Sequence, residues 1–208
     1  MNTTEQNLEA LRDIRSMMER SSRFISLSGW SGISAGTCAL IGAWFAIKRI
    51  NSYYGNEYDY STACPSCLKN DLITIATFVF IGAFITATLF TFLKSRKEGV
   101  AIWGSAARRL LWNTLLPMLT GGFLLWRMME LKEYQLIAPG CLIFYGLALV
   151  NGSKYSIGEV RYLGYAEILT GIVALWTVRS GIYYWAFGFG ILHIVYGVAM
   201  WWKYERSS

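Results

Sequence analysis

Charged residues are scarce in this sequence. They make up 15% of the 208 positions, whereas hydrophobic residues make up 54% and the mean hydropathy is +0.36. A soluble domain contains about 25% charged residues. The charges that are present lie in short patches between long apolar runs. This distribution indicates an integral membrane protein, because each membrane-spanning helix needs ~20 apolar residues.

Several motifs for common enzyme chemistries are also missing. The sequence has no Walker loop, no dinucleotide-binding fingerprint and no metalloprotease motif. Its only histidine is His193, so a classical hydrolytic triad could be centred only there. One Glu with one His is too small a set for a transition-metal site. We therefore expect no metal and no cofactor, and the sequence favours a protein that is not an enzyme.

The apolar runs define the expected architecture. They are continuous rather than alternating, which favours helices over a transmembrane barrel. We expect an all-α bundle of six transmembrane helices in a domain at residues 25–202, followed by a short cytoplasmic tail at residues 203–208. The predicted spans are Ile25–Ile47, Leu72–Leu93, Leu110–Trp126, Gln135–Val150, Tyr162–Val178 and Tyr183–Trp202.

The segment at residues 1–24 is predicted to be an amphipathic helix. Leu8, Leu11, Ile14 and Met18 recur at steps of three and four residues, with charged residues facing away. Such a helix lies on the membrane surface or binds a protein partner, and both alternatives stay open. Because these mostly polar residues precede the first apolar run, we expect no cleavable signal peptide.

Basic residues predict the orientation of the chain. Most of the 19 lysines and arginines lie in the N-terminal segment, the tail and the connections at residues 94–109 and 151–161. Cytoplasmic loops carry such an excess, so both termini are predicted to be cytoplasmic. The net charge of +6 therefore indicates a membrane surface rather than nucleic acid. The basic residues Lys94, Arg96, Lys97, Arg108 and Arg109 either bind anionic lipid head groups or only enforce this topology.

Small residues on the last two predicted spans form two stripes. On the first of these spans the stripe contains Gly164, Gly171 and Ala174, and on the second it contains Ala186, Gly190 and Gly197. The tight turn near residue 180 puts the two stripes at matching depths, so they could pack closely against each other. On the first span, Ser28, Gly32 and Gly36 and the neighbouring Ala35, Ala39 and Ala43 could pack helices or form an oligomer contact.

Glu167 and His193 lie within the two C-terminal stripes at the same depth. An ionisable residue inside a membrane is costly, so it usually faces the bundle interior and finds a partner. We therefore predict that the two side chains are in contact. The pair is a structural hydrogen bond between helices, a proton-relay or ligand site, or a lipid-facing pair, and the sequence leaves these alternatives open.

Cys64 and Cys67 form a C-P-S-C element just before the second predicted span. This loop is predicted to be extracytoplasmic, where a disulfide is permitted in bacteria. The pair forms a structural disulfide, takes part in thiol–disulfide exchange, or stays reduced. Its position is similar to that in the quinone-linked membrane oxidases of disulfide catalysts. That family needs a second extracytoplasmic pair, whereas Cys38 and Cys141 both lie in predicted spans.

The C-terminal third contains the pieces N-G-S-K-Y, E-V-R-Y-L-G-Y and G-I-L-H-I-V-Y-G between Tyr145 and Glu205. It resembles small uncharacterised bacterial multi-span proteins, which implies a location in the bacterial inner membrane. Three functions stay open. The first is a non-enzymatic protein that binds a partner or senses a condition. The second is a proton-coupled transporter using Glu167 and His193, and the third is a thiol-redox protein using Cys64 and Cys67.

Overall fold

The computed structural model describes residues 28–55, 64–98, 103–177 and 180–206, and all regular structure in these ranges is helical. The predicted all-α class is therefore confirmed. The segment at residues 1–24, predicted to be an amphipathic helix, lies outside the described residues. The first five long helices are α2 (Gly29–Gly55), α3 (Pro65–Glu98), α4 (Ser105–Glu130), α5 (Ile137–Gly152) and α6 (Val160–Trp176). The short 3-10 helices η1 (Tyr134–Leu136) and η2 (Ser153–Tyr155) flank α5.

The last helical rod consists of three joined parts. It begins with α7 (Gly181–Trp185), continues through the π-helical segment η3 (Ala186–Leu192) and ends with α8 (His193–Tyr204). A π-helical segment inside an α-helix is rare and often occurs at functional sites. Here it ends directly before the only histidine of the chain.

Each predicted span corresponds to a helix, and α2, α3, α4 and the last rod are longer than the apolar runs. α2 continues to Gly55, about two turns beyond the predicted end of the first span. α3 begins at Pro65, a residue whose fixed φ suits the first helical position. The basic residues of the predicted 94–109 connection therefore lie at the end of α3 and in the first turn of α4.

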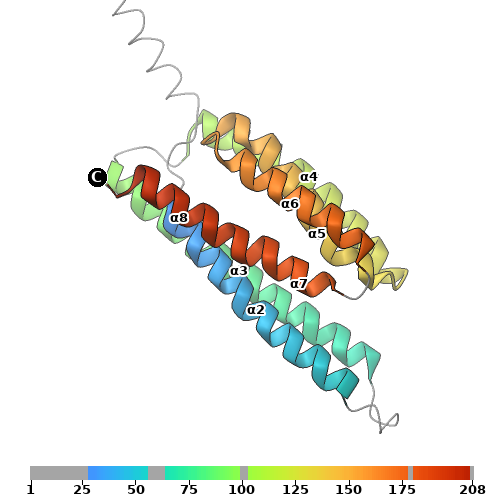
Figure 1. Ribbon diagram of the computed structural model, residues 1–208. Helices are drawn as coiled ribbons and strands as arrows, with labels where there is room; N and C mark the ends of the chain where they lie inside the picture. Colours follow the sequence, from blue (N-terminus) through green and yellow to red (C-terminus); the bar gives the residue numbers. More distant parts are fainter. Residues whose placement is uncertain (1–27, 56–63, 99–102, 178–179, 207–208) are drawn as a thin grey trace, which may run out of the picture.

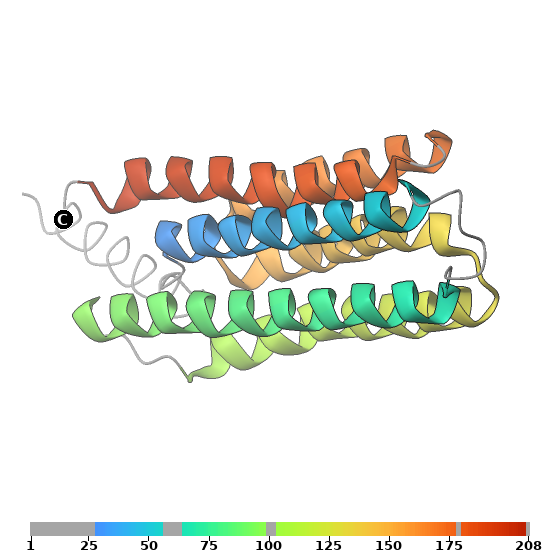
Figure 2. The same cartoon turned by 90° about the horizontal axis from the view of Figure 1, so that it is seen from below.

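The helices form two groups that run side by side (Figure 1). In one group α2 packs between α3 and the last rod, and in the other α5 packs between α4 and α6. The groups meet where α7 and η3 contact α5 and α6. Successive helices run in opposite directions (Figure 2), so the start of α2 and the end of α8 lie at the same end of the bundle.

Four stretches in the described part are long and apolar enough to cross a membrane: Gly29–Tyr54, Ser66–Lys97, Tyr134–Tyr155 and Gly181–Tyr204. α6 has 17 residues, a little short of the ~20 that cross a bilayer. Large apolar side chains point outward, for example Phe78 and Phe123, which are 71% and 77% exposed. An apolar exterior of this extent suits lipid better than water.

The glycines of the two C-terminal small-residue stripes pack against other helices, whereas Glu167 and His193 of the same stripes meet each other. A Cβ added at Gly164 would lie 2.8 Å from the Gly146 carbonyl oxygen of α5. A Cβ added at Gly197 would lie 2.6 Å from the Gly29 carbonyl oxygen of α2. Gly171 likewise faces α5 and Gly190 faces α2. The turn sets the depth of a residue along the bundle, whereas its direction around the helix depends on the other neighbours.

The small residues of the first span also pack inside the chain. A Cβ added at Gly36 would lie 2.6 Å from the Gly190 carbonyl oxygen, and Gly32 lies against Gly197. Ala39 and Ala43 are buried. This stripe is therefore used by α2 and its neighbours within one chain, which leaves little of it for an oligomer contact.

Candidate functional site

Three polar side chains from three helices meet in the core. His193, at the start of α8, lies between Glu167 of α6 and Tyr145 of α5. The distance from Nδ1 of His193 to Oε1 of Glu167 is 3.3 Å, so the predicted contact is present. The distance from Nε2 of His193 to the hydroxyl of Tyr145 is 2.8 Å. The cluster therefore joins the last rod to the α4–α5–α6 group.

The hydrogen bonds of His193 define where its proton lies. Nδ1 is 3.1 Å from the carbonyl oxygen of Gly188, which can only accept, so Nδ1 carries a hydrogen and donates it. Nε2 then accepts from the hydroxyl of Tyr145 when the imidazole is neutral. The ring of Phe189 stacks on the imidazole at 5.9 Å between centroids and fixes its plane. The orientation of His193 is thus set by η3 and α5, not by Glu167.

Glu167 lacks the hydrogen bonds that usually accompany a buried carboxylate. Its side chain is 0% exposed, and neither of its oxygens has a hydrogen-bond partner among the described residues. An ionised carboxylate left unpaired in such a place costs several kcal/mol. An ionised Glu167 would therefore need a compensating partner, and His193 is the ionisable side chain that contacts it.

Gly188 of η3 provides the space for the carboxyl group. A Cβ added there would lie 2.5 Å from Oε2 of Glu167 and 2.4 Å from Cδ2 of Leu142. Both distances are far below ordinary van der Waals contact, so a larger residue here would have to displace the ends of the Glu167 and Leu142 side chains. Sequence reasoning missed both Gly188 and Tyr145, because the hairpin geometry relates only α6 to the last rod. The unusual G-F-G spacing in η3 is the one local signal of this packing.

A second polar junction lies at the end of the bundle where α2 begins and α8 ends. Oε1 of Glu205 accepts a hydrogen bond of 2.8 Å from the backbone N–H of Gly29 and lies 3.2 Å from Nζ of Lys94. A carboxylate at the start of a helix is stabilised by the free N–H groups there. The predicted tail residue Glu205 is thus part of the bundle.

The candidate lipid-binding residues lie around this junction or beyond it. Lys94 contacts Glu205, whereas Arg96, Lys97, Arg108 and Arg109 are exposed on helix ends. Next to the junction is an open groove of about 290 Å³. Its lining residues are Ser28, Trp30, Phe90, Leu93, Lys94, Lys97, Trp201, Tyr204 and Glu205. Tryptophan with lysine is the combination found at the head-group level of a membrane.

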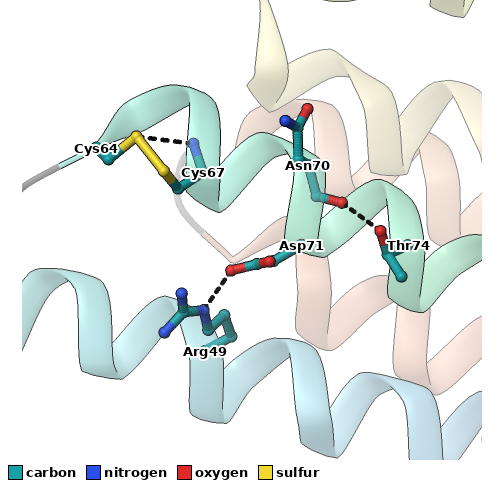
Figure 3. A network of polar contacts seen from close by, with 6 residues as sticks. All are labelled: Arg49, Cys64, Cys67, Asn70, Asp71 and Thr74. Atoms are coloured by element: carbon teal, nitrogen blue, oxygen red, sulfur yellow. Dashed lines mark hydrogen bonds and ion pairs between the residues drawn. A yellow bond between two sulfur atoms is a disulfide. The ribbon is translucent and has the colours of Figure 1, made fainter.

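The opposite end of the bundle contains the cysteine pair (Figure 3). Cys64 and Cys67 are joined by a disulfide at the start of α3, with a Cα–Cα distance of 5.2 Å. One turn further, Asp71 of α3 accepts a hydrogen bond of 2.6 Å from Nε of Arg49 on α2. Cys38 and Cys141, on α2 and α5, are free thiols.

One apparent nucleophile motif proves to be ordinary helix. The residues Gly32–Gly36 read G-I-S-A-G, the pattern of a hydrolase nucleophile elbow, which requires a strand-to-helix turn. Here the pattern lies inside α2, and the hydroxyl of Ser34 donates to the carbonyl oxygen of Ser31 at 3.0 Å. It therefore forms no catalytic elbow.

In the described ranges, no group of three or more His, Cys, Asp and Glu side chains is placed to hold a metal ion. The chain matches no protein-family model, no curated protein and no solved structure with which it was compared.

Proposed function

We propose that this chain is an integral membrane protein of six transmembrane helices that senses a condition through the protonation of Glu167 and His193. The observation that carries the proposal is the buried Glu167 carboxyl group, which has no hydrogen-bond partner among the described residues. A purely structural Glu–His link would have a direct hydrogen bond between the two side chains. Here the Nδ1 hydrogen is donated to the carbonyl oxygen of Gly188 instead. The carboxyl group therefore lacks a donor that would stabilise its ionised form.

The groups that face Glu167 determine its response to protons. They include Tyr145 from α5 and His193 from α8. From η3, Gly188 lies against the carboxyl group. None of these groups is a permanent cation. Loss of a proton held by the Glu167–His193 pair would therefore leave a negative charge that none of these groups neutralises.

The position of the cluster explains how protonation could change the fold. His193 belongs to the rod that packs on α2, whereas Glu167 and Tyr145 belong to the α4–α5–α6 group. A charge appearing between the two groups would weaken their association, because a buried unpaired charge is strongly unfavourable. The relative position of the groups would then report the proton state to both ends of the bundle.

In the proposed topology, the protein lies in the bacterial inner membrane and both termini are on the cytoplasmic side. Support comes from the basic residues Arg96, Lys97, Arg108 and Arg109, which lie at the same end of the bundle as Glu205. The segment at residues 1–24 precedes α2 in the sequence and is the proposed contact for a protein partner.

Labelling with a membrane-impermeant maleimide after reduction tests the orientation. Labelling of Cys64 and Cys67 in intact cells supports it, and labelling only after permeabilisation contradicts it.

The test of sensing uses spin labels on α3 and α4, one in each group, in lipid nanodiscs. The wild-type protein is expected to change the distance between the labels with pH, and Glu167→Gln is expected to remove this change. Glu130→Gln, at an exposed carboxylate of α4, is the matched control and should leave the change intact. A pH response that persists in Glu167→Gln would contradict the proposal.

Proton-coupled transport by the same pair is the alternative function. The groove of about 290 Å³ near Glu205 is lined by neither Glu167 nor His193. Proton flux in vesicles containing the purified protein distinguishes the two functions. A flux that Glu167→Gln abolishes would favour transport.

A further inference from the structure

We propose that the Cys64–Cys67 disulfide exchanges with protein dithiols, with Cys67 as the attacked sulfur and Cys64 as the leaving thiolate. This site lies at the other end of the bundle from Glu205 and goes beyond the proposed proton sensing. The chemical class of its partner is a protein that carries two neighbouring thiols.

The surroundings of the two sulfur atoms differ. Cys64 directly precedes α3, and its carbonyl oxygen accepts hydrogen bonds from the N–H groups of Cys67 and Leu68, as in a helix N-cap. Its sulfur takes the place of a capping side chain, because the backbone N–H of Cys67 lies 3.2 Å from it. The hydroxyl of Ser66 is also 3.2 Å from this sulfur. Two donors and the start of a helix thus stabilise negative charge on Cys64.

Cys67 is more accessible to a partner than Cys64 is. It is exposed, whereas Cys64 is half-buried. A thiolate must reach the sulfur that it attacks in line with the bond that breaks, and the thiol with the better stabilised anion leaves faster. Exposure of Cys67 and stabilisation of Cys64 therefore favour the same direction of attack.

Polar contacts near the disulfide link the start of α3 to α2. The Arg49–Asp71 ion pair joins α2 to α3 one turn beyond the disulfide (Figure 3). On the same turn the hydroxyl of Thr74 donates to the carbonyl oxygen of Asn70 at 2.8 Å. The disulfide thus lies at a helix start that an ion pair links to α2, and Cys67 is exposed there.

The exchange consists of two successive thiolate attacks. A thiolate of the partner attacks Sγ of Cys67, a new S–S bond forms, the Cys64–Cys67 bond breaks, and Cys64 leaves with the electron pair. The second thiolate of the partner then attacks its own sulfur in the mixed disulfide and releases Cys67. The partner becomes a disulfide, the chain receives two electrons, and two protons from the partner or water complete its thiols. The same steps in reverse would reduce a partner disulfide.

The experiment uses the full chain with Cys38→Ala and Cys141→Ala, in nanodiscs. The first probe is reduced glutathione, followed by acid quenching and mass spectrometry of the mixed disulfide. The adduct is expected on Cys67, with Cys64 as the free thiol. An adduct mainly on Cys64 would overturn the assigned direction. The second probe is reduced thioredoxin, a protein dithiol, which is expected to reduce the pair within minutes. A disulfide that resists it and yields only to a phosphine reductant would be a structural link and would overturn the proposal.

Single-cysteine variants test the stabilised thiolate independently. In the same background, Cys67→Ser leaves Cys64 and Cys64→Ser leaves Cys67. Cys64 is expected to react with iodoacetamide ~10-fold faster than Cys67 at about pH 6, because only Cys64 is near the donors that favour a thiolate. Ser66→Ala should reduce this difference. Equal rates for the two cysteines would contradict the assignment, and an unchanged unfolding midpoint in each variant confirms that the comparison concerns folded protein.

Discussion

The hydrogen bond between Tyr145 and His193 offers the sharpest test of the core cluster. Tyr145→Phe removes one hydroxyl oxygen and keeps the aromatic ring, which packs on Phe189 at 5.0 Å between centroids. Nε2 of His193 would then lose its partner at 2.8 Å, in a residue that is 6% exposed. The variant therefore changes the polar cluster with little effect on the apolar packing around it.

The expected magnitude follows from the unsatisfied nitrogen. Leaving a buried acceptor without a hydrogen bond costs ~1–3 kcal/mol. Tyr183→Phe is the matched control, because Tyr183 is 59% exposed and such a change should stay within about 0.5 kcal/mol. Both free energies of unfolding can be measured in mixed micelles, with tryptophan fluorescence as the signal and denaturing detergent as the variable.

A double-mutant cycle then asks whether Tyr145 and Glu167 act through the same imidazole. Tyr145→Phe and Glu167→Gln should couple by at least ~0.5 kcal/mol, because both replace a polar group that contacts the imidazole of His193. The reasoning is refuted if Tyr145→Phe destabilises no more than Tyr183→Phe. Additive effects in the cycle would show that the three side chains do not form one unit.

Three further predictions concern the glycine contact and the helix ends. Gly188→Ala should destabilise the protein by ~1–3 kcal/mol through overpacking, whereas Gly122→Ala, where a Cβ meets nothing within 4 Å, should be neutral or stabilising in the same unfolding assay. A hydrogen bond from Lys203 holds the pKa of Glu159 below its ordinary value of 4.5, so this contact stabilises the fold above that pH and is lost as the pH falls; Glu159→Gln should flatten the acid side of a stability-versus-pH curve. Glu205→Gln should weaken the cap of α2, detected as faster amide hydrogen exchange in the first turn of that helix and unchanged exchange in the middle of α4.

The sequence was sufficient to predict the class of the fold and one contact within the site. Continuous apolar runs specified helices, and the tight turn near residue 180 put Glu167 and His193 at equal depth. Equal depth did not determine which faces of the helices meet, so the glycines of the two stripes pack on α5 and α2 instead of on each other. The direction of a face depends on all neighbours at once, which no local pattern contains.

The missing parts of the site come from tertiary packing. Tyr145 reaches His193 from a helix that is distant in sequence, and Gly188 acts through a π-helical segment that shifts the register of the last rod. Glu205 was expected in a free tail because its partners, the start of α2 and the end of α3, are brought to it only by the folded bundle.

The central claim is that the buried carboxyl group of Glu167 binds and releases a proton. Infrared difference spectroscopy during a pH titration observes this directly, because a protonated carboxylic acid has a carbonyl stretching band that the carboxylate lacks. The wild-type protein in nanodiscs is expected to show such a band changing with pH. The band should be absent in Glu167→Gln and retained in Glu130→Gln. A spectrum in which Glu167→Gln removes no pH-dependent carboxyl band would contradict the proton-binding role.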